Sequence, residues 1–275
     1  MGKSIKGEVM KRVITIVANE LEESIKTEKI LTKKLIEAGF STSNQIEENT
    51  ELIISIGGDG SFLRAMDRFE FPSIPTMIIN TGTLGFLAEI QPEQIDKFIK
   101  EYINNEYTIE EASIIKANIF TKDMKKTIRA INEVVIKNIA SRTVHLDLSV
   151  NDIKMQRFSG DGMLISTPIG STAYNYSAGG SIVDPRLELF QLTPIAPMNT
   201  KVYRSFTSSI ILPPDSIITI HPHLRFENSI LVVIDGTEFR YNDIVKIDIK
   251  RSRVKIKFLR LKDYNFWYNV SEKFL

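Results

Sequence analysis

The stretch Leu52–Arg64 constrains the fold of this chain more than any other. It joins a short apolar run to the glycine turn Gly57-Gly58-Asp59-Gly60 and then to residues that are compatible with a helix. This order predicts a buried parallel strand that is followed at once by a helix, with Asp59 at the carboxyl end of the strand. Glycines let a bulky anion approach the backbone, and the free N–H groups at a helix start favour phosphate. We therefore predict a phosphate loop with a carboxylate beside it.

This loop differs from two familiar nucleotide-binding motifs. No Lys-Ser or Lys-Thr pair closes it, so it is not a Walker A loop, and Leu63 stands where the dinucleotide fingerprint has its third glycine. The phosphate-loop candidates are Gly57, Gly58, Gly60, Ser61 and Arg64. The alternative interpretation is a glycine turn in which Asp59 only caps the helix.

The composition sets few further limits. A length of 275 residues leaves room for two domains, and a formal net charge of +1 gives no reason to expect a nucleic-acid or membrane partner. The absence of cysteine excludes disulfides, thiolate nucleophiles and zinc–thiolate sites. No signal-peptide pattern follows the N-terminal lysines, and no apolar run reaches the roughly 20 residues that a membrane span needs. We expect a soluble, cytoplasmic protein.

The first part of the chain alternates strands with helices. Residues 13–17 predict a strand, residues 21–36 a helix, and the run at Leu52 the next strand, which together make a βαβ start. Residues 76–79 predict a further strand that ends in a second glycine loop, Asn80–Phe86. Ligands of parallel sheets bind beyond the carboxyl ends of the strands, so the two loops should converge there. Pro92 opens another helix.

After about residue 107 the pattern changes to short strands separated by turns. The predicted strands are Ile114–Phe120, Ile128–Ile136, Val144–Val150, Ile153–Phe158, Gly162–Ser166, Ile210–Leu212, Ile217–His221, Ile230–Ile234, Ile244–Ile249 and Val254–Phe258. So many strands predict an all-β, sandwich-like second domain after an α/β domain with a parallel sheet. The aromatic tail Tyr264–Tyr268 should dock on the first domain. The predicted domains are 1–106, completed by 259–275, and 107–258.

Four more stretches are more polar or glycine-rich than packing requires. Asn132-Glu133 precedes an apolar strand and is either a binding pair or a solvated strand end, while Gly160-Asp161-Gly162 is either a site or a turn. The small and hydroxyl residues of Ser166–Gly180 leave room for a ligand, and its tyrosines offer an aromatic face. Asp235-Gly236-Thr237 is typical of a turn. The histidine cluster His221-Pro222-His223 lacks nearby carboxylates in the sequence, so it does not predict a metal site.

Taken together, these motifs resemble the NAD kinase family in order and spacing from about Leu52 to Asp235. The segment from Thr167 to Tyr174 is the specific part, because 6-phosphofructokinases and lipid kinases carry glycine–aspartate loops like this one. The resemblance implies transfer of the γ-phosphoryl group of ATP, or of polyphosphate, to the adenosine 2′-hydroxyl of NAD. It also implies an α/β and a β-rich domain that enclose the site, a divalent metal ion (Mg²⁺ or Mn²⁺) held mainly by substrate phosphates, and a homo-oligomer, with a tetramer favoured.

The resemblance assigns a role to each matching position. Asp59 would be the catalytic base, with Gly60 beside it, and Asn132 and Glu133 would hold ribose hydroxyls and the pyrophosphate side. The remaining NAD-binding positions that it implies are Asp161, near the nicotinamide amide, and Ile169, Thr172, Ala173, Tyr174, Asn175, Tyr176, Ser177 and Ala196. No protein residue is implied as a dedicated metal ligand.

The chain departs from the family pattern at two positions. Ser159 stands where many members have a basic residue, and Thr237 stands where many have glutamine. Arg157 has the strand parity to replace the missing charge of position 159. Two other classes of function remain open at this point: a lipid or sugar kinase, for which a membrane-facing stretch or a second acidic motif is missing, and a nucleotide sensor without turnover.

Overall fold

The computed structural model of the chain describes residues 12–82, 85–139, 142–200, 204–223 and 230–274. The chain divides into two compact units. Unit 1 comprises Met1–Glu111 with Ile256–Leu275, and unit 2 comprises Ala112–Lys255. Two strands, β5 (Tyr107–Thr121) and β16 (Ile244–Leu261), run from one unit into the other.

Unit 1 contains the predicted parallel sheet. Its strands in spatial order are β2 (Ser41–Ser43), β1 (Val13–Ala18), β3 (Thr50–Ile56), β4 (Thr76–Ile79) and the end of β16. Every pairing among these strands is parallel. Leu52–Ile56 are buried without a break, as expected of a strand that is covered on both faces.

The short strand β2 was not predicted, and it changes the topology. β2 follows the first helix and pairs with β1 on the side away from β3. The βαβ unit therefore consists of β1, the helix and β2, and the expectation that β3 completes it is wrong. The strand order reverses between β1 and β3, and such a switch point opens a crevice beyond the carboxyl ends of the two strands.

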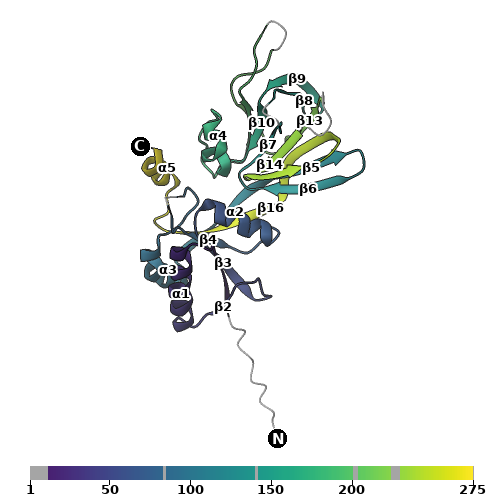
Figure 1. Cartoon of the computed structure of the whole chain (residues 1–275). Coiled ribbons are helices and arrows are strands. Elements are labelled where there is room, and N and C mark those ends of the chain that lie inside the picture. Colours follow the sequence, from purple (N-terminus) through teal and green to yellow (C-terminus); the bar gives the residue numbers. More distant parts are fainter. Residues whose placement is uncertain (1–11, 83–84, 140–141, 201–203, 224–229, 275) are drawn as a thin grey trace. The chain divides into compact units, whose positions relative to one another are not determined.

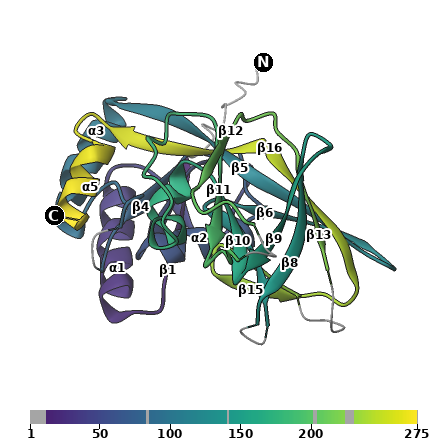
Figure 2. The same cartoon turned by 90° about the horizontal axis from the view of Figure 1, so that it is seen from above.

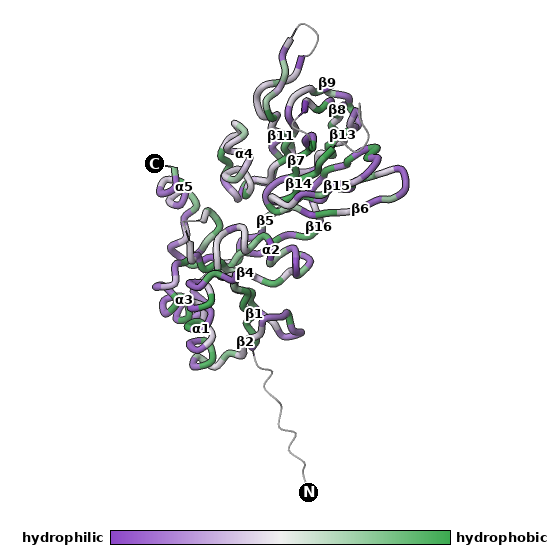
Figure 3. Tube along the Cα trace, viewed as in Figure 1, coloured by the Kyte–Doolittle hydropathy of each residue, from purple (hydrophilic) through white to green (hydrophobic). Residues whose placement is uncertain are grey.

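Helices cover both faces of this sheet. α1 (Glu22–Glu37) and α3 (Ile95–Ile103) contact each other on one face, and α2 (Asp59–Arg68) lies on the opposite face (Figures 1 and 2). The turn η1 (Pro92–Gln94) leads into α3, with the proline at its first position. Figure 3 shows β1 and β4 as largely hydrophobic, whereas hydrophobic and hydrophilic residues alternate along α1.

The C-terminal tail belongs to unit 1, as its aromatic composition predicts. It ends in α5 (Phe266–Phe274). Phe266 is buried and Tyr264 is partly buried, but Trp267 and Tyr268 are 49% and 62% exposed. Only part of the aromatic tail therefore packs on the core, because a helix of nine residues presents its other face to solvent.

Unit 2 is the predicted β-rich domain with two sheets. Among the described residues, one antiparallel sheet follows the order β12 (Ile210–Leu212), β11 (Phe190–Ile195), β10 (Gly162–Ser166), β7 (Glu133–Asn138), β14 (Ile230–Ile234) and β15 (Thr237–Arg240). The second sheet contains the unit 2 part of β16 with β13 (Ile218–Pro222), β8 (Val144–Val150), β9 (Ile153–Gly160), β5 and β6 (Lys125–Ala130).

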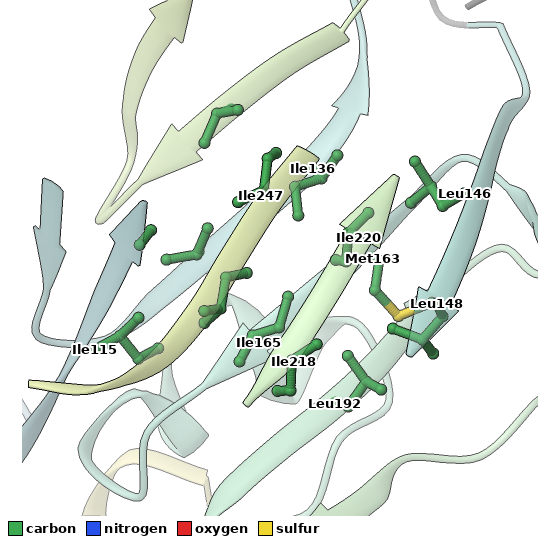
Figure 4. Packing of buried hydrophobic residues seen from close by; sticks show 14 of the residues in the cluster. Ile115, Ile136, Leu146, Leu148, Met163, Ile165, Leu192, Ile218, Ile220 and Ile247 are labelled. Carbon is green, nitrogen blue, oxygen red and sulfur yellow. The ribbon is translucent and has the colours of Figure 1, made fainter. Parts of the chain in front are cut away.

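The core of unit 2 lies between these two sheets. Figure 4 shows Ile136, Met163 and Ile165 of the first sheet among Ile218 and Ile220 of the second. These side chains are fully buried, which is the packing of a β-sandwich. The fold class predicted from the sequence is confirmed.

Two strand predictions in unit 2 are wrong in their boundaries. The apolar run Ile128–Ile136 is not one strand, because β6 ends at Ala130 and β7 begins at Glu133 in the other sheet. Ile244–Ile249 and Val254–Phe258 are not two strands but one, β16. Hydrophobic alternation reveals a boundary only where turn residues interrupt it, and it cannot show that a chain changes sheets.

Two other strands were not predicted at all. β11 contains Pro194, which argues against a strand, yet Pro194 lies beyond the three residues that pair with β12. β15 is short and mostly exposed, so it lacks apolar alternation. No helix within the described ranges is long and apolar enough to cross a membrane.

Candidate active site

Asp59 is the first residue of α2, but it does not cap that helix. The N-cap is Gly58, and no side chain hydrogen bonds to the first turn as a cap. Instead, Asp59 Oδ2 accepts the N–H of Phe86 at 2.9 Å, and Oδ1 accepts the N–H of Leu87 at 3.3 Å. Both donors come from the loop after β4, so the two glycine loops meet as expected. These contacts exclude the interpretation of Asp59 as a helix cap.

The close approach of the two loops depends on Gly85. A Cβ atom at this position would lie 2.3 Å from Asp59 Oδ1, closer than any side chain can come. At the start of the same loop, the Asn80 side chain bonds in both directions to the backbone of Gly82. Thr83 and Leu84 of the predicted loop lie outside the described residues.

The surroundings of Asp59 make it a stronger base than an exposed aspartate. Burial raises its pKa above the ordinary value, while the two N–H groups and the cations Lys273 and Arg260 oppose this effect. The Lys273 ammonium lies 4.0 Å from the centre of the Phe86 ring. A carboxylate with a raised pKa can accept a proton from a hydroxyl group that is being activated. Lys273 escaped the sequence analysis, which gave the C-terminal tail only a structural role.

The other phosphate-loop candidates gather at the switch point of the sheet. Asn19 directly follows β1, and its Nδ2 donates to Ser61 Oγ at 3.1 Å. Arg64 Nη2 donates to the same Ser61 oxygen at 3.3 Å, and Gly60 lies between Asp59 and Ser61. Asn19 lies just beyond the carboxyl end of β1. It reaches Ser61 because β1 and β3 are neighbours in the sheet.

In unit 2, the turn between β14 and β15 supplies a carboxylate that binds the backbone of residues 131–133. The Asp235 carboxylate accepts the N–H groups of Ile131 at 2.7 Å, Asn132 at 2.8 Å and Glu133 at 3.1 Å. It therefore fixes the backbone of the predicted binding pair. The sequence analysis missed this function of Asp235, because the anchoring residue lies about a hundred positions away. Thr237, where the family pattern is broken, is exposed at the start of β15.

The side chains of Asn132 and Glu133 are buried and incompletely paired. They are 8% and 6% exposed, so neither is a solvated strand end. Among the described residues, Asn132 Oδ1 and Glu133 Oε2 have no hydrogen-bond partner. Burial, and secondly the charge of Asp235, raises the pKa of Glu133 from 4.5 to about 8. Buried polar atoms without partners are rare and call for an explanation, such as a ligand that supplies the missing bonds.

The Ser166–Gly180 stretch packs directly on this pair. The Thr167 N–H donates to Asn132 O at 2.9 Å, and the Thr167 hydroxyl donates to Ile131 O at 2.6 Å. A Cβ atom at Gly170 would lie 2.2 Å from Asn132 O, so only glycine fits there. The structure therefore brings together two of the stretches that the sequence singled out.

The remaining residues of this stretch form η2 (Ile169–Thr172) and α4 (Tyr174–Ser177). Ile169 and Thr172 are buried, Ala173 is partly buried, and Tyr174, Tyr176 and Ser177 are exposed. Asn175 is fully buried, and its amide bonds to Ser171 O, Ser181 O and the Thr193 hydroxyl. Its side chain thus holds the stretch in shape.

Asp161 and Ala196 lie together at the other end of β10. The Asp161 N–H donates to Ile195 O at 3.0 Å, and the Asp161 side chain is exposed. Ser166, at the far end of β10, pairs with Glu133. The predicted unit 2 residues therefore form two groups, separated by the five residues of β10, or roughly 16 Å.

Ser159 and Arg157, the two positions considered for a positive charge near Asp161, both make contacts with other residues. Ser159 is fully buried and bonds to His145 Nδ1 at 2.8 Å. Arg157 is exposed and makes a bidentate ion pair with Asp147. His223 also contacts Asp147, so one carboxylate does approach the histidine cluster. In the part of the chain that the structure describes, no three His, Asp or Glu side chains gather as metal ligands.

Comparisons with known proteins agree with these motifs. A sequence model of the ATP-NAD kinase N-terminal domain matches residues 8–107, and one of the ATP-NAD kinase C-terminal domain matches residues 131–261. The chain is 40% identical over 269 residues to the NAD kinase of Finegoldia magna, covering 96% of this chain and 98% of that protein. It is 33% identical over 272 residues to NAD kinase 1 of Listeria monocytogenes, covering 97% and 99%.

Two solved structures share the fold. An Archaeoglobus fulgidus NAD kinase in complex with ATP matches with a TM-score of 0.76 at 26% identity, covering 95% of this chain and 98% of that one. Yeast NADH kinase complexed with NADH matches with a TM-score of 0.84 at 21% identity, covering 95% and 87%. With both domain models matched in order and relatives of this identity over almost the whole length, the chain belongs to the ATP-NAD kinase family.

Proposed function

We propose that this protein is an NAD kinase, which transfers the γ-phosphoryl group of ATP to the adenosine 2′-hydroxyl of NAD. The observation that carries this proposal beyond family membership is the Asn132–Glu133 pair. Its two buried acceptor atoms have no partner among the described residues, and ribose hydroxyls are donors of the right kind. A solvated strand end would not leave these two side chains buried.

In the proposed reaction, the 2′-oxygen forms a bond to the γ-phosphorus of ATP while the bond to the β,γ-bridging oxygen breaks. ADP leaves, and the proton of the 2′-hydroxyl passes to Asp59. The Phe86 and Leu87 N–H groups hold the Asp59 carboxylate in place before the proton arrives. Phosphoryl transfer asks a protein mainly for positioning and charge stabilisation, which Asp59 and the phosphate loop supply in this proposal.

The unit 2 residues receive NAD in this proposal. Glu133 and Asn132 bind ribose hydroxyls, Thr172–Ser177 surround the adenine, and Asp161 with Ala196 meets the nicotinamide amide. The roughly 16 Å along β10 between the two groups suits an extended dinucleotide better than a sugar or a lipid headgroup. Because the Asn175 side chain is engaged internally, we assign it the positioning of its neighbours rather than a direct contact.

A divalent ion, Mg²⁺ or Mn²⁺, belongs to the proposal as a partner of the nucleotide phosphates. The described residues offer no cluster of carboxylates and histidines that fits it, so no step is assigned to a protein-bound metal. A homo-oligomer, with a tetramer favoured, remains an implication of the family resemblance, and a cytoplasmic location remains a prediction from the sequence.

The deciding experiment incubates the pure protein with ATP, Mg²⁺ and NAD, and detects NADP with a dehydrogenase that uses only NADP. We expect NADP to accumulate with time. Folded protein that yields no NADP with ATP, GTP or polyphosphate, with either metal, would refute the proposal. Binding of NAD without turnover would point to a nucleotide sensor instead.

A further inference from the structure

Arg260, near the end of β16, is a buried cation next to the loop that holds Asp59. It is 5% exposed. Its guanidinium lies over two aromatic rings, 4.5 Å from the centre of Phe258 and 3.7 Å from that of Tyr264. These contacts restrict the orientation of the guanidinium and therefore the direction of its N–H groups.

This guanidinium ties the Asp59 loop to β16. Arg260 Nη1 donates to Leu87 O at 3.2 Å and to Glu89 Oε2 at 3.1 Å. The other oxygen of Glu89 accepts the N–H of Leu261 at 2.6 Å. Glu89 and Arg260 together thus join the loop to the strand by three bonds, all made by buried groups.

The same loop carries the donors that bind Asp59. Leu87 contacts Asp59 through its N–H and Arg260 through its carbonyl oxygen. A second fastening comes from the sheet, because the N–H of Glu89 donates to Ile78 O at 3.0 Å. Arg260 therefore holds the carbonyl side of the peptide segment whose Leu87 N–H binds Asp59.

We infer that Arg260, held in place by Glu89, is a positioning residue that fixes the orientation and charge of the Asp59 carboxylate through the Leu87 peptide. The inference rests on the proposed function, because it treats Asp59 as the base of the kinase reaction. Neither Glu89 nor Arg260 lies in the motifs that the sequence singled out. No contact with substrate is assigned to either residue.

Several groups act on the protonation of Asp59. Burial raises its pKa most. The N–H groups of Phe86 and Leu87 lower the pKa, and so do the cations Lys273 of α5 and Arg260 of β16. Tyr264 faces the same cluster. Glu110 lies 3.7 Å from Arg260 Nε and, with Glu89, partly neutralises the guanidinium.

Two substitutions should therefore move the pKa of Asp59 in opposite directions. Arg260→Met removes a positive charge and loosens the loop, so the pKa of Asp59 rises. Glu89→Gln keeps the shape and the acceptor for Leu261 but leaves Arg260 less neutralised, so the pKa falls. A role that is only structural would lower the melting temperature without producing shifts of opposite sign.

The first measurement is the pH dependence of kcat for NADP formation. We expect the acidic limb to move to higher pH in Arg260→Met and to lower pH in Glu89→Gln, with the KM for NAD unchanged. A shift of one pH unit corresponds to roughly a tenfold change in rate on that limb. Arg12→Met is the matched control, because Arg12 also pairs with a glutamate and packs on two aromatic rings, but far along the sheet from Asp59. The acidic limb of the kcat profile of Arg12→Met should lie at the same pH as that of the parent.

The second measurement does not need activity. In each background, the melting temperature is compared with that of the same protein carrying Asp59→Asn, from about pH 4 to about pH 8. The pH at which this difference stops changing marks the pKa of Asp59 in the folded protein. We expect the pKa of Asp59 to be lowest in Glu89→Gln, intermediate in the parent and highest in Arg260→Met. If Arg260→Met does not fold, Glu89→Gln alone still tests the predicted fall.

The outcomes separate this inference from the proposed function. Equal Asp59 pKa values in all backgrounds, or shifts in the same direction, would overturn the inference even if NADP is formed. Shifts of opposite sign in a parent that forms no NADP would support the charge coupling and refute only the kinase proposal.

Discussion

Glu133 offers a test in which stability and binding should change in opposite directions. Its carboxyl group is buried without a full set of partners, and its pKa rises from 4.5 to about 8. Between these two values the unfolded chain has lost the proton, whereas the folded protein still holds it. The unfolded state therefore binds fewer protons, and the free energy of unfolding falls as the pH rises through this window.

The magnitude follows from the width of the window. Each unit of pKa difference is worth about 1.4 kcal/mol, so ionisation of Glu133 in the unfolded chain costs the fold about 3 kcal/mol at pH 7. Glu133→Gln resembles the protonated side chain and has no proton to lose. We expect it to match the parent in stability near pH 4.5 and to exceed it by about 3 kcal/mol near pH 7.

The same residue should matter for NAD. Hydrogen bonds to a charged group contribute about 1.5–3 kcal/mol, so Glu133→Ala should weaken NAD binding about 10- to 150-fold where Glu133 is ionised. Near pH 7 the parent must first lose the proton, which costs about 1.4 kcal/mol and reduces the difference about tenfold. The KM for NAD of the parent should therefore fall as the pH rises through about 8, with little change in the KM for ATP.

Denaturant unfolding of the parent and of Glu133→Gln from about pH 4.5 to about pH 8 gives the free energies of unfolding. Steady-state kinetics of the parent and of Glu133→Ala give the KM values for NAD and ATP. Glu238→Gln is the control, because Glu238 is an exposed glutamate of unit 2 that forms a surface ion pair with Arg240. The reasoning is refuted if Glu133→Gln gains no stability near pH 7. It is also refuted if the KM values for NAD and ATP rise together in Glu133→Ala.

Three further changes test the Asp59 site and the tail. Asp59→Asn should lower turnover about 10²- to 10⁴-fold with nearly normal NAD binding, and more than about a tenth of parental kcat would show that Asp59 is not the base. Gly85→Ala should also lower kcat, because its Cβ would lie 2.3 Å from Asp59 Oδ1. Gly82→Ala in the same loop is the control, because its Cβ would meet no atom of the described residues within 4 Å, and it should lower kcat much less. Removal of Tyr264–Leu275 should lower the melting temperature, since each fully buried large apolar side chain is worth about 1.5–3 kcal/mol; an unchanged melting temperature would show that the tail does not support unit 1.

The sequence by itself determined the local elements and the chemistry of the loops. An apolar run next to glycines can hardly be anything but a buried strand and a tight turn, which is why β3, the start of α2 and the position of Asp59 were predictable. Strands such as β8, β10 and β14 were predicted to the residue, because turn residues bound their apolar runs. The resemblance to a family added the roles.

Only the tertiary structure decided which distant residues meet. β2 is too short and too polar for a pattern, yet its pairing with β1 places the switch point of the sheet between β1 and β3, where Asn19 contacts Ser61. The contacts of Asp235 with the Asn132–Glu133 backbone, and of Arg260 with the Asp59 loop, join residues more than a hundred positions apart. Periodicity reports the environment along one segment, whereas hydrogen bonds and charges act across space. The protonation of Asp59 and Glu133 depends on burial and on neighbours from other segments, so it could be known only once the chain was folded.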